Sequence, residues 1–136
     1  MTIRSGTRAD LDEVVDLWHH AAGPSRHPGG QAEAEILLRR DPEALLVAVT
    51  DGRLVGTLIV GWDGWRCHLY RLAVEESVRR SGIAGALVAE ARRRASDHGA
   101  VRIDAMVNTD NPGAVAFWEN AGFSADSHDG RWSLVV

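Results

Sequence analysis

The stretch from Leu72 to Gly85, LAVEESVRRSGIAG, decides the fold. It begins with three apolar residues, passes through a basic turn and ends in small residues. Apolar positions then recur about every 3.6 residues, at Ile83, Leu87, Val88, Ala91 and Ala95. Gly99 follows this pattern, as glycine commonly does after a helix. The segment therefore predicts a strand, a tight turn and an amphipathic helix.

The turn has the composition of an anion site. The first amides of a helix have no partners within the helix and lie at the positive end of its dipole, so a phosphate can bind there. Gly82 allows unusual backbone angles, while Ala84 and Gly85 let a ligand approach closely. Arg79 and Arg80 add positive charge. The alternative is a strand-to-helix turn that needs a glycine for its backbone alone, since neither a Walker loop nor the three-glycine dinucleotide fingerprint is present.

Upstream, the pattern predicts one strand, two helices and a hairpin. The strand is Thr2 to Ser5, and Thr7 with Asp10 resembles a weak capping box before the first helix. Residues 23–30 hold three glycines and two prolines, which predicts a loop where a ligand could enter, and Ala32 to Arg39 resumes as a helix. Asp51-Gly52 then separates two apolar, β-branched runs, Leu45 to Val49 and Leu54 to Gly61.

Downstream, a turn at residues 62–65 leads into the strand His68 to Val74. Val101 to Val107 is predicted as a strand, and Asn111-Pro112 opens a helix that closes at Gly122. Two short terminal strands are expected at Phe123 to Ala125 and Trp132 to Val136. The fold class is therefore α+β, with a central mixed, mostly antiparallel sheet of six to seven strands and about four helices, in the order β-α-α-β-β-β-α-β-α-β-β.

Composition narrows the class of protein. The chain has 136 residues, of which 45% are hydrophobic and 25% charged, so one globular domain over residues 1–136 is expected. A net charge of −4 gives no general attraction to nucleic acid. The single cysteine, Cys67, cannot form an internal disulfide, and the apolar runs are too short to span a bilayer. We expect a cytoplasmic protein that binds neither nucleic acid nor membrane.

Two motifs carry a resemblance to a known family. Leu72-Ala73-Val74 followed by Arg79-x-x-Gly82-x-Ala84 resembles the acetyl-CoA signature of GNAT acetyltransferases. The segment from Asn111 to Phe123 resembles the second family motif, through Asn111, Ala114, Phe117, Trp118, Gly122 and Phe123. Residues 61–66, GWDGWR, further resemble a segment of small bacterial members. The resemblance covers nearly the whole chain and implies an acetyl-CoA-dependent N-acetyltransferase with the GNAT fold.

The resemblance also implies a donor site. Backbone groups of Leu72 and Val74 pair with the pantetheine arm, the amides from Arg80 to Gly85 hold the pyrophosphate, and Asn111 contacts the pantetheine portion. Asn111 could alternatively serve only as the cap of its helix. The donor-binding residues expected are Leu72, Ala73, Val74, Arg79, Arg80, Ser81, Gly82, Ile83, Ala84, Gly85, Asn111, Phe117 and Trp118.

The chain departs from the family at two catalytic positions. Trp118 stands where many members carry a tyrosine that protonates the leaving thiolate, and indole cannot act as that acid. Met106 stands where ribosomal-protein acetyltransferases carry a glutamate base. Attention therefore moves to His68 and Tyr70, which strand alternation places on the same face as Leu72 and Val74. Serotonin N-acetyltransferase is similar in carrying a histidine at the position of His68.

His68 is the expected general base, acting directly or through water, and Tyr70 orients the substrate or donates a proton. Alternatively His68 only fills a strand position, and Asp63 and Glu75 are the next candidates for the base. The thiolate could also leave without a proton donor, because a free thiol has a pKa of about 8.5. Cys67 points away from His68 by alternation and is a poor nucleophile. No metal is expected, because the remaining histidines, His19, His20, His27, His98 and His128, lack ligand spacing.

Two other functions stay open at this point. One is a regulatory acyl-CoA-binding domain with little turnover, and the other is a tRNA-modifying toxin of the same fold, which the acidic balance disfavours. The expected partners are acetyl-CoA and an amine acceptor, either a small molecule or a peptide or protein amine. The chain is expected to be a monomer or a homodimer.

Overall fold

The computed structural model describes residues 1–21 and 29–136. The chain divides into two compact units, Met1–Met106 and Val107–Val136. His27 and most of the predicted ligand-entry loop, residues 23–28, lie outside the described residues. No described helix combines the length and the apolar character needed to cross a membrane.

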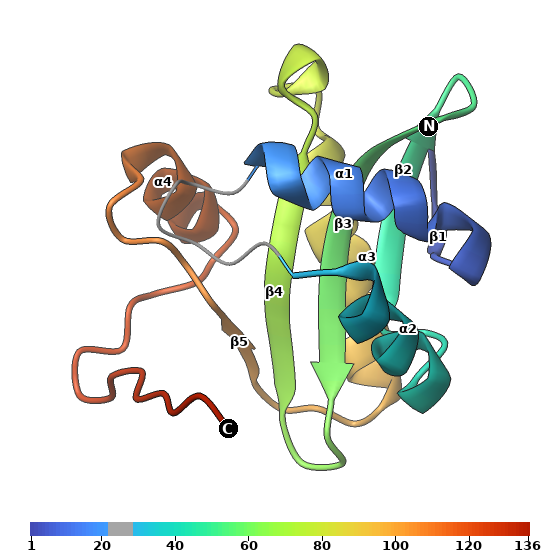
Figure 1. Ribbon diagram of the computed structural model, residues 1–136. Coiled ribbons are helices and arrows are strands. Elements are labelled where there is room, and N and C mark those ends of the chain that lie inside the picture. Colours follow the sequence, from blue (N-terminus) through green and yellow to red (C-terminus); the bar gives the residue numbers. More distant parts are fainter. Residues whose placement is uncertain (22–28) are drawn as a thin grey trace. The chain divides into compact units, whose positions relative to one another are not determined.

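The first unit contains a five-stranded sheet in sequential order (Figure 1). Neighbouring strands are antiparallel except the last pair, β4 and β5, which run parallel. The strands are β1 (Thr2–Ser5), β2 (Leu45–Thr50), β3 (Arg53–Trp62), β4 (Cys67–Val74) and β5 (Ile103–Ala105). The two predicted hairpins, β2–β3 and β3–β4, are confirmed, whereas β5 is shorter than the predicted strand Val101 to Val107.

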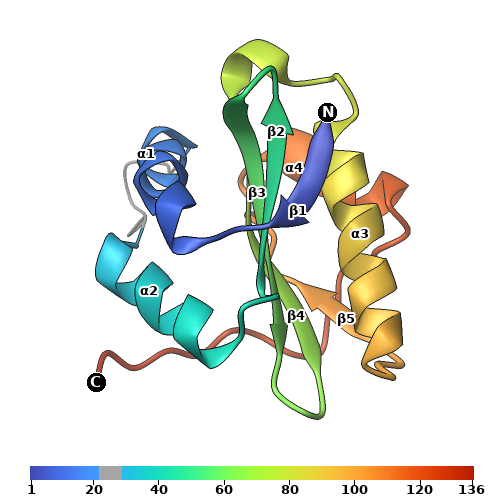
Figure 2. The same cartoon turned by 90° about the vertical axis from the view of Figure 1, so that its right-hand side faces the viewer.

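Helices cover both faces of this sheet (Figure 2). α1 (Leu11–Ala21) and α2 (Gln31–Arg40) lie on one face, and α3 (Ile83–Asp97) lies on the other. On the first face Trp18 of α1 belongs to a buried cluster with Val47, Ile59 and Ala73. On the second face α3 packs so closely that a Cβ on Gly56 of β3 would lie 3.0 Å from the Ile83 side chain. Short 3-10 turns, η1 (Arg8–Asp10) and η2 (Glu76–Val78), precede α1 and α3.

β4 contains a bulge that the sequence pattern does not predict. Tyr70 pairs with Ile59 but Ala73 pairs with Thr57, so β4 has one residue more than β3 between these pairs. Arg71, in the bulge, has a φ of 56°, in the left-handed region that few non-glycine residues adopt.

The bulge overturns one prediction. Opposed residues of an antiparallel pair share a face, so Tyr70 lies on the α1–α2 face with Ile59, whereas Val74 lies on the α3 face with Gly56. The expectation that His68 and Tyr70 share a face with Leu72 and Val74 is therefore wrong. The extra residue shifts by one position the alternation of side chains between the two faces of the sheet.

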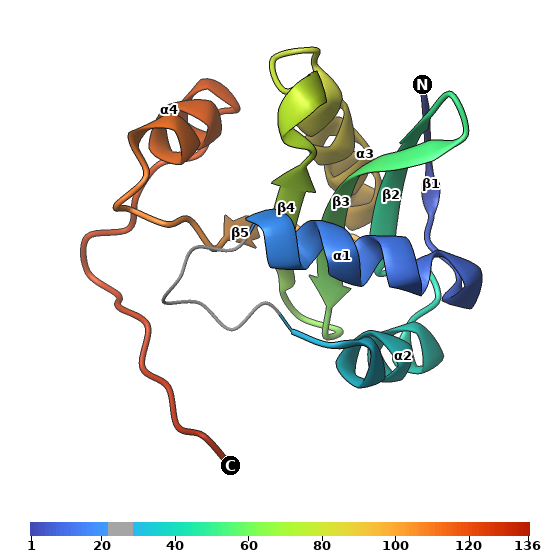
Figure 3. The same ribbon diagram turned by 45° about the horizontal axis from the view of Figure 1, so that its top comes forward.

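The second unit contains α4 (Pro112–Asn120) and an irregular C-terminal segment (Figure 3). Asn111 caps the helix, since its side-chain oxygen accepts a hydrogen bond from the Ala114 amide at 3.1 Å. Trp118 packs edge-on against Phe117 and Phe123, with ring centroids 5.4 and 4.9 Å apart.

The two terminal strands predicted at residues 123–125 and 132–136 do not form, so the sheet has five strands in the described residues rather than six or seven. An apolar run becomes a strand only where its amides and carbonyls find a neighbouring backbone, and neither segment has a ladder partner in the described chain. Four apolar side chains of the last segment are almost fully exposed, namely Trp132, Leu134, Val135 and Val136.

Candidate active site

The sheet opens between its last two strands. β5 pairs with β4 only over Cys67 to Leu69, and the Met106 amide adds one bond to the Leu69 carbonyl at 3.0 Å. On the other side of β4, the Glu75 amide donates to Val55 of β3 at 2.8 Å. Bonding direction alternates along a strand, so Ala73 also faces β3. The amides of Leu72 and Val74 are therefore directed at the open edge.

A turn with left-handed residues links this edge to α3. Arg80 has a φ of 65° and Gly82, which caps α3, has a φ of 85°. The Arg79 side chain donates to the Val74 carbonyl at 3.1 Å, and the Ser81 hydroxyl donates to the Val78 carbonyl. These two bonds tie the turn to the end of β4.

The start of α3 is open to a ligand. The first hydrogen bond of the helix runs from the Ala86 amide to the Gly82 carbonyl at 3.0 Å. The amides of residues 83–85 precede it and have no acceptor within the helix. Among the described residues, no side chain caps this end. A Cβ built at Gly82 or Gly85 would meet no atom of the described chain within 4 Å. The space beside these amides suits a pyrophosphate, which needs several N–H donors and no side chain in the way.

His68 lies between two carboxylates. Its Nε2 is 3.9 Å from Asp63 Oδ2 in the β3–β4 turn, and its Nδ1 is 3.9 Å from Asp104 Oδ2. Asp104 is the register partner of His68 in β5 and also pairs with Arg102, Nε to Oδ1 at 3.1 Å. The side chain of His68 is 41% exposed, so solvent reaches the imidazole.

Asp63 stays ionised at neutral pH. Its Oδ1 accepts hydrogen bonds from the amides of Arg66 and Trp65, each at 2.7 Å. These two bonds lower the pKa of the Asp63 carboxyl, and the charge of His68 contributes further. Because Oδ1 is held in this way, Oδ2 faces the imidazole.

Tyr70 lies on the same face of β4 as His68, two residues closer along the strand to Leu72 and the open edge. Burial raises the pKa of its phenol, so the hydroxyl is protonated at neutral pH. The ring passes close over Gly61, where an added Cβ would lie 3.4 Å from Tyr70 Cε1. A Cβ at position 61 would therefore meet the Tyr70 ring at ordinary van der Waals contact.

Two further groups follow from the sequence, the Glu75 carboxylate as a possible base and the Cys67 thiol as a possible nucleophile. Glu75 follows the end of β4 and pairs with Arg53, Oε1 to Nη2 at 2.5 Å. Cys67 is fully buried, and this burial raises the pKa of its thiol, with smaller effects from Asp104 and Asp63. Both features disfavour these groups as base or nucleophile.

Asp104 was missed because the register of β5 against β4 cannot be read from the strand's own residues. In the second unit, the capping role of Asn111 is observed, whereas donor contacts by Asn111, Phe117 and Trp118 stay predictions.

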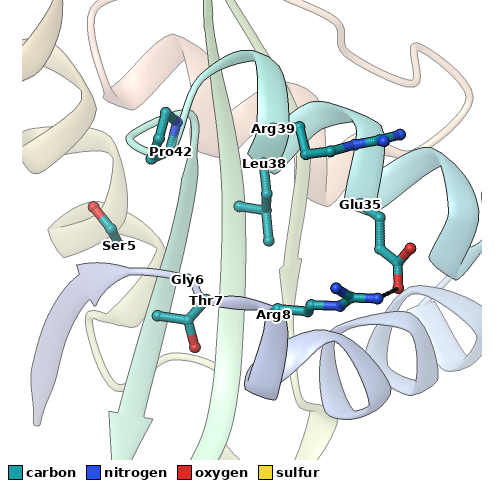
Figure 4. Close-up of a pocket in the computed structure, with 8 residues that line it drawn as sticks. All are labelled: Ser5, Gly6, Thr7, Arg8, Glu35, Leu38, Arg39 and Pro42. Carbon is teal, nitrogen blue, oxygen red and sulfur yellow. Dashed lines mark ion pairs between the residues drawn. The ribbon is translucent and has the colours of Figure 1, made fainter.

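A pocket of about 440 Å³ lies elsewhere, between the end of β1 and α2 (Figure 4). Arg8 and Glu35 form an ion pair across it at 3.5 Å. None of its lining residues is a predicted site residue; they are Ser5, Gly6, Thr7, Arg8, Glu35, Leu38, Arg39 and Pro42.

Comparison with known proteins shows the family to which the chain belongs. Residues 11–123 match the model of the acetyltransferase (GNAT) family. An acetyltransferase of Yersinia enterocolitica is 32% identical over 125 residues, covering 90% of this chain and 87% of that protein. An acetyltransferase of Sodalis glossinidius is 33% identical over 121 residues, covering 88% and 84%.

Solved structures share the fold. Ard1 from Thermoplasma volcanium superposes with a TM-score of 0.83 at 24% identity, covering 93% of this chain and 84% of that one. An aminoglycoside antibiotic 6'-N-acetyltransferase from Acinetobacter haemolyticus gives 0.77 at 19%, covering 100% and 99%. The chain belongs to the GNAT family and is an N-acetyltransferase.

Proposed function

We propose that this acetyltransferase uses acetyl-CoA to acetylate a primary amine by direct attack on the thioester. One observation carries the proposal: the outward amides of Leu72 and Val74 lead along β4 to the open amides at the start of α3. An extended arm can add to the strand edge while its pyrophosphate binds the helix start. This pair of sites fits a coenzyme A thioester.

The acceptor side is assigned to His68 and Tyr70. A primary ammonium gives one proton to His68, and its freed lone pair then forms the C–N bond at the thioester carbonyl carbon. Leu72 lies four residue steps along the strand from His68, about 13 Å at about 3.3 Å per step, so water relays this proton. A strand amide near Val74 stabilises the developing oxyanion.

The leaving group needs a proton as the C–S bond breaks. Tyr70 donates its phenolic proton to the thiolate sulfur and regains one from the nitrogen of the new amide. The net products are the N-acetylated amine, coenzyme A thiol and one proton on His68, which passes to solvent. Trp118 supplies no proton in this scheme, because its indole N–H is a donor only and does not ionise usefully.

Calorimetry and thiol release test the proposal together. We expect micromolar binding of acetyl-CoA and thiol release with at least one member of a panel of alkylamines, diamines, aminosugars and peptides. His68→Gln should lower kcat about 100-fold while acetyl-CoA affinity stays within twofold. His19→Gln, an exposed change in α1, is the matched control.

Three results would each contradict a part of the proposal. Binding without turnover on any amine would favour the regulatory acyl-CoA-binding function instead. Absence of acetyl-CoA binding would exclude the assigned donor site. Equal kcat in the His68→Gln and His19→Gln variants would reject His68 as the base and return Asp63 to consideration.

A further inference from the structure

The bulge in β4 determines which amides face the donor. On the N-terminal side of the bulge, the Leu69 carbonyl faces β5, so the backbone amide and carbonyl of Tyr70 face β3. Were the strand regular, Leu72 and Val74 would also face β3, because bonding direction alternates. The extra residue reverses this order and turns both amides to the open edge. Donor binding along this edge therefore depends on the bulge.

A buried hydroxyl holds the bulge in place. Thr57 of β3 is fully buried, and its hydroxyl donates to the Arg71 carbonyl at 3.0 Å. The same hydroxyl accepts a hydrogen bond from the indole Nε1 of Trp18 at 2.9 Å. The Arg71 guanidinium lies 5.4 Å from the centroid of the Trp18 ring. One hydroxyl thus joins α1, β3 and the bulged residue of β4.

Neither contact is easily replaced. Trp18 is only 4% exposed, and the carbonyl of Arg71 belongs to a residue with a left-handed backbone. Without the hydroxyl, a buried indole N–H and a bulge carbonyl both lose a partner. The backbone of Arg71 would then relax toward a regular strand, which places Ala73 at the donor edge instead of Leu72 and Val74.

We propose that Thr57, held by Trp18, is a positioning residue for the acyl donor: its hydroxyl keeps the bulge that directs the Leu72 and Val74 amides to the pantetheine arm. The proposal rests on the donor site assigned above. Thr57 itself contacts no substrate, since it is fully buried under α1.

Thr57→Val tests the proposal, since it removes the hydroxyl at nearly constant volume. We expect its Kd for acetyl-CoA, measured by calorimetry, to rise about 30-fold. The Kd for 3'-phosphoadenosine 5'-diphosphate, the donor without its pantetheine arm, should stay within twofold because that fragment reaches only the turn and α3. Thr57→Ser keeps the hydroxyl and should bind acetyl-CoA within threefold of wild type. Thr50→Val in β2 is the matched control.

The two probes separate a positioning role from general damage. Equal weakening of both probes in Thr57→Val, or no weakening of either, would overturn the proposal. If that variant does not fold, Trp18→Phe, which removes the indole N–H together with the five-membered ring that carries it, must show the same selective loss for acetyl-CoA. Failure of the wild type to bind acetyl-CoA would instead reject the assigned donor site.

Discussion

At the residue scale, Asp10 shows how one carboxylate can connect two elements. Its carboxylate accepts from both terminal nitrogens of Arg4 in β1, at 2.8 and 2.9 Å, and from the Thr7 amide at 2.7 Å. The hydrogen bond from Arg4 is the main cause that lowers the pKa of Asp10 to about 2, and the Thr7 amide contributes. The partner role of Asp10 with Thr7 follows from the sequence spacing. The contact with Arg4 does not, because it depends on how β1 enters η1.

Asp10 should make stability depend on pH in a defined window. Its folded pKa lies below the ordinary value of 3.8, so the stabilisation is complete above about pH 4 and is lost as pH falls toward 2. Asp10→Asn should therefore cost about 1 kcal/mol at pH 7, after allowance for solvent screening of the exposed Arg4, and almost nothing near pH 2. Urea unfolding at several pH values measures this difference. A cost for Asp10→Asn that stays constant across these pH values would contradict the assignment.

Some of the site residues can be recognised from the sequence alone, and others cannot. Gly82, Ala84 and the flanking arginines are recognisable because an anion site at a helix start needs small residues and positive charge in a short segment. Asp104 and Thr57 are not, because each acts through a partner distant in sequence.

At the scale of the element, α3 offers a matched pair of glycines. Gly82 at its start has a φ of 85° and Gly99 just beyond its end has a φ of 84°. A Cβ at either position would meet no atom within 4 Å in the part of the chain that the structure describes. Gly82→Ala and Gly99→Ala should therefore cost a similar amount, about 1 kcal/mol. Only Gly82→Ala should weaken acetyl-CoA binding, by about tenfold, because only that glycine adjoins the donor turn. Thermal unfolding and calorimetry on both variants check this, and equal affinities would remove the turn from the donor site.

β4 marks the limit of pattern reading for an element. Its alternation is correct from Cys67 to Tyr70, where buried and accessible residues alternate as predicted. It fails beyond Arg71 because a bulge is stabilised by contacts from other elements, Trp18 and Thr57, and adds no local signal such as a glycine. The face assignment of His68 and Tyr70 was therefore predictable, whereas that of Leu72 and Val74 was not.

At the scale of the whole molecule, the order of elements through α4 follows from turn signals and periodicity, since each helix and hairpin has its own local determinants. The C-terminal residues differ. Trp132 to Val136 has the alternation of a strand, but strand formation depends on an available edge, which no local pattern specifies. Because the partner edge of this segment cannot be read from the sequence, the sequence does not decide between the predicted monomer and the predicted homodimer.

The proposed donor contacts assign residues to each unit, and hydrogen exchange can test each assignment separately. Saturating acetyl-CoA should slow amide exchange in residues 72–85 of the first unit and in residues 111–118 of the second, because bound ligand suppresses local opening. Exchange in β1, which carries no assigned donor contact, should change little. Gly82→Ala at the same acetyl-CoA concentration should lose part of the protection in proportion to its lower occupancy. Protection confined to the first unit would reject donor contacts by Asn111, Phe117 and Trp118, while leaving the β4 edge and the α3 turn as the donor site.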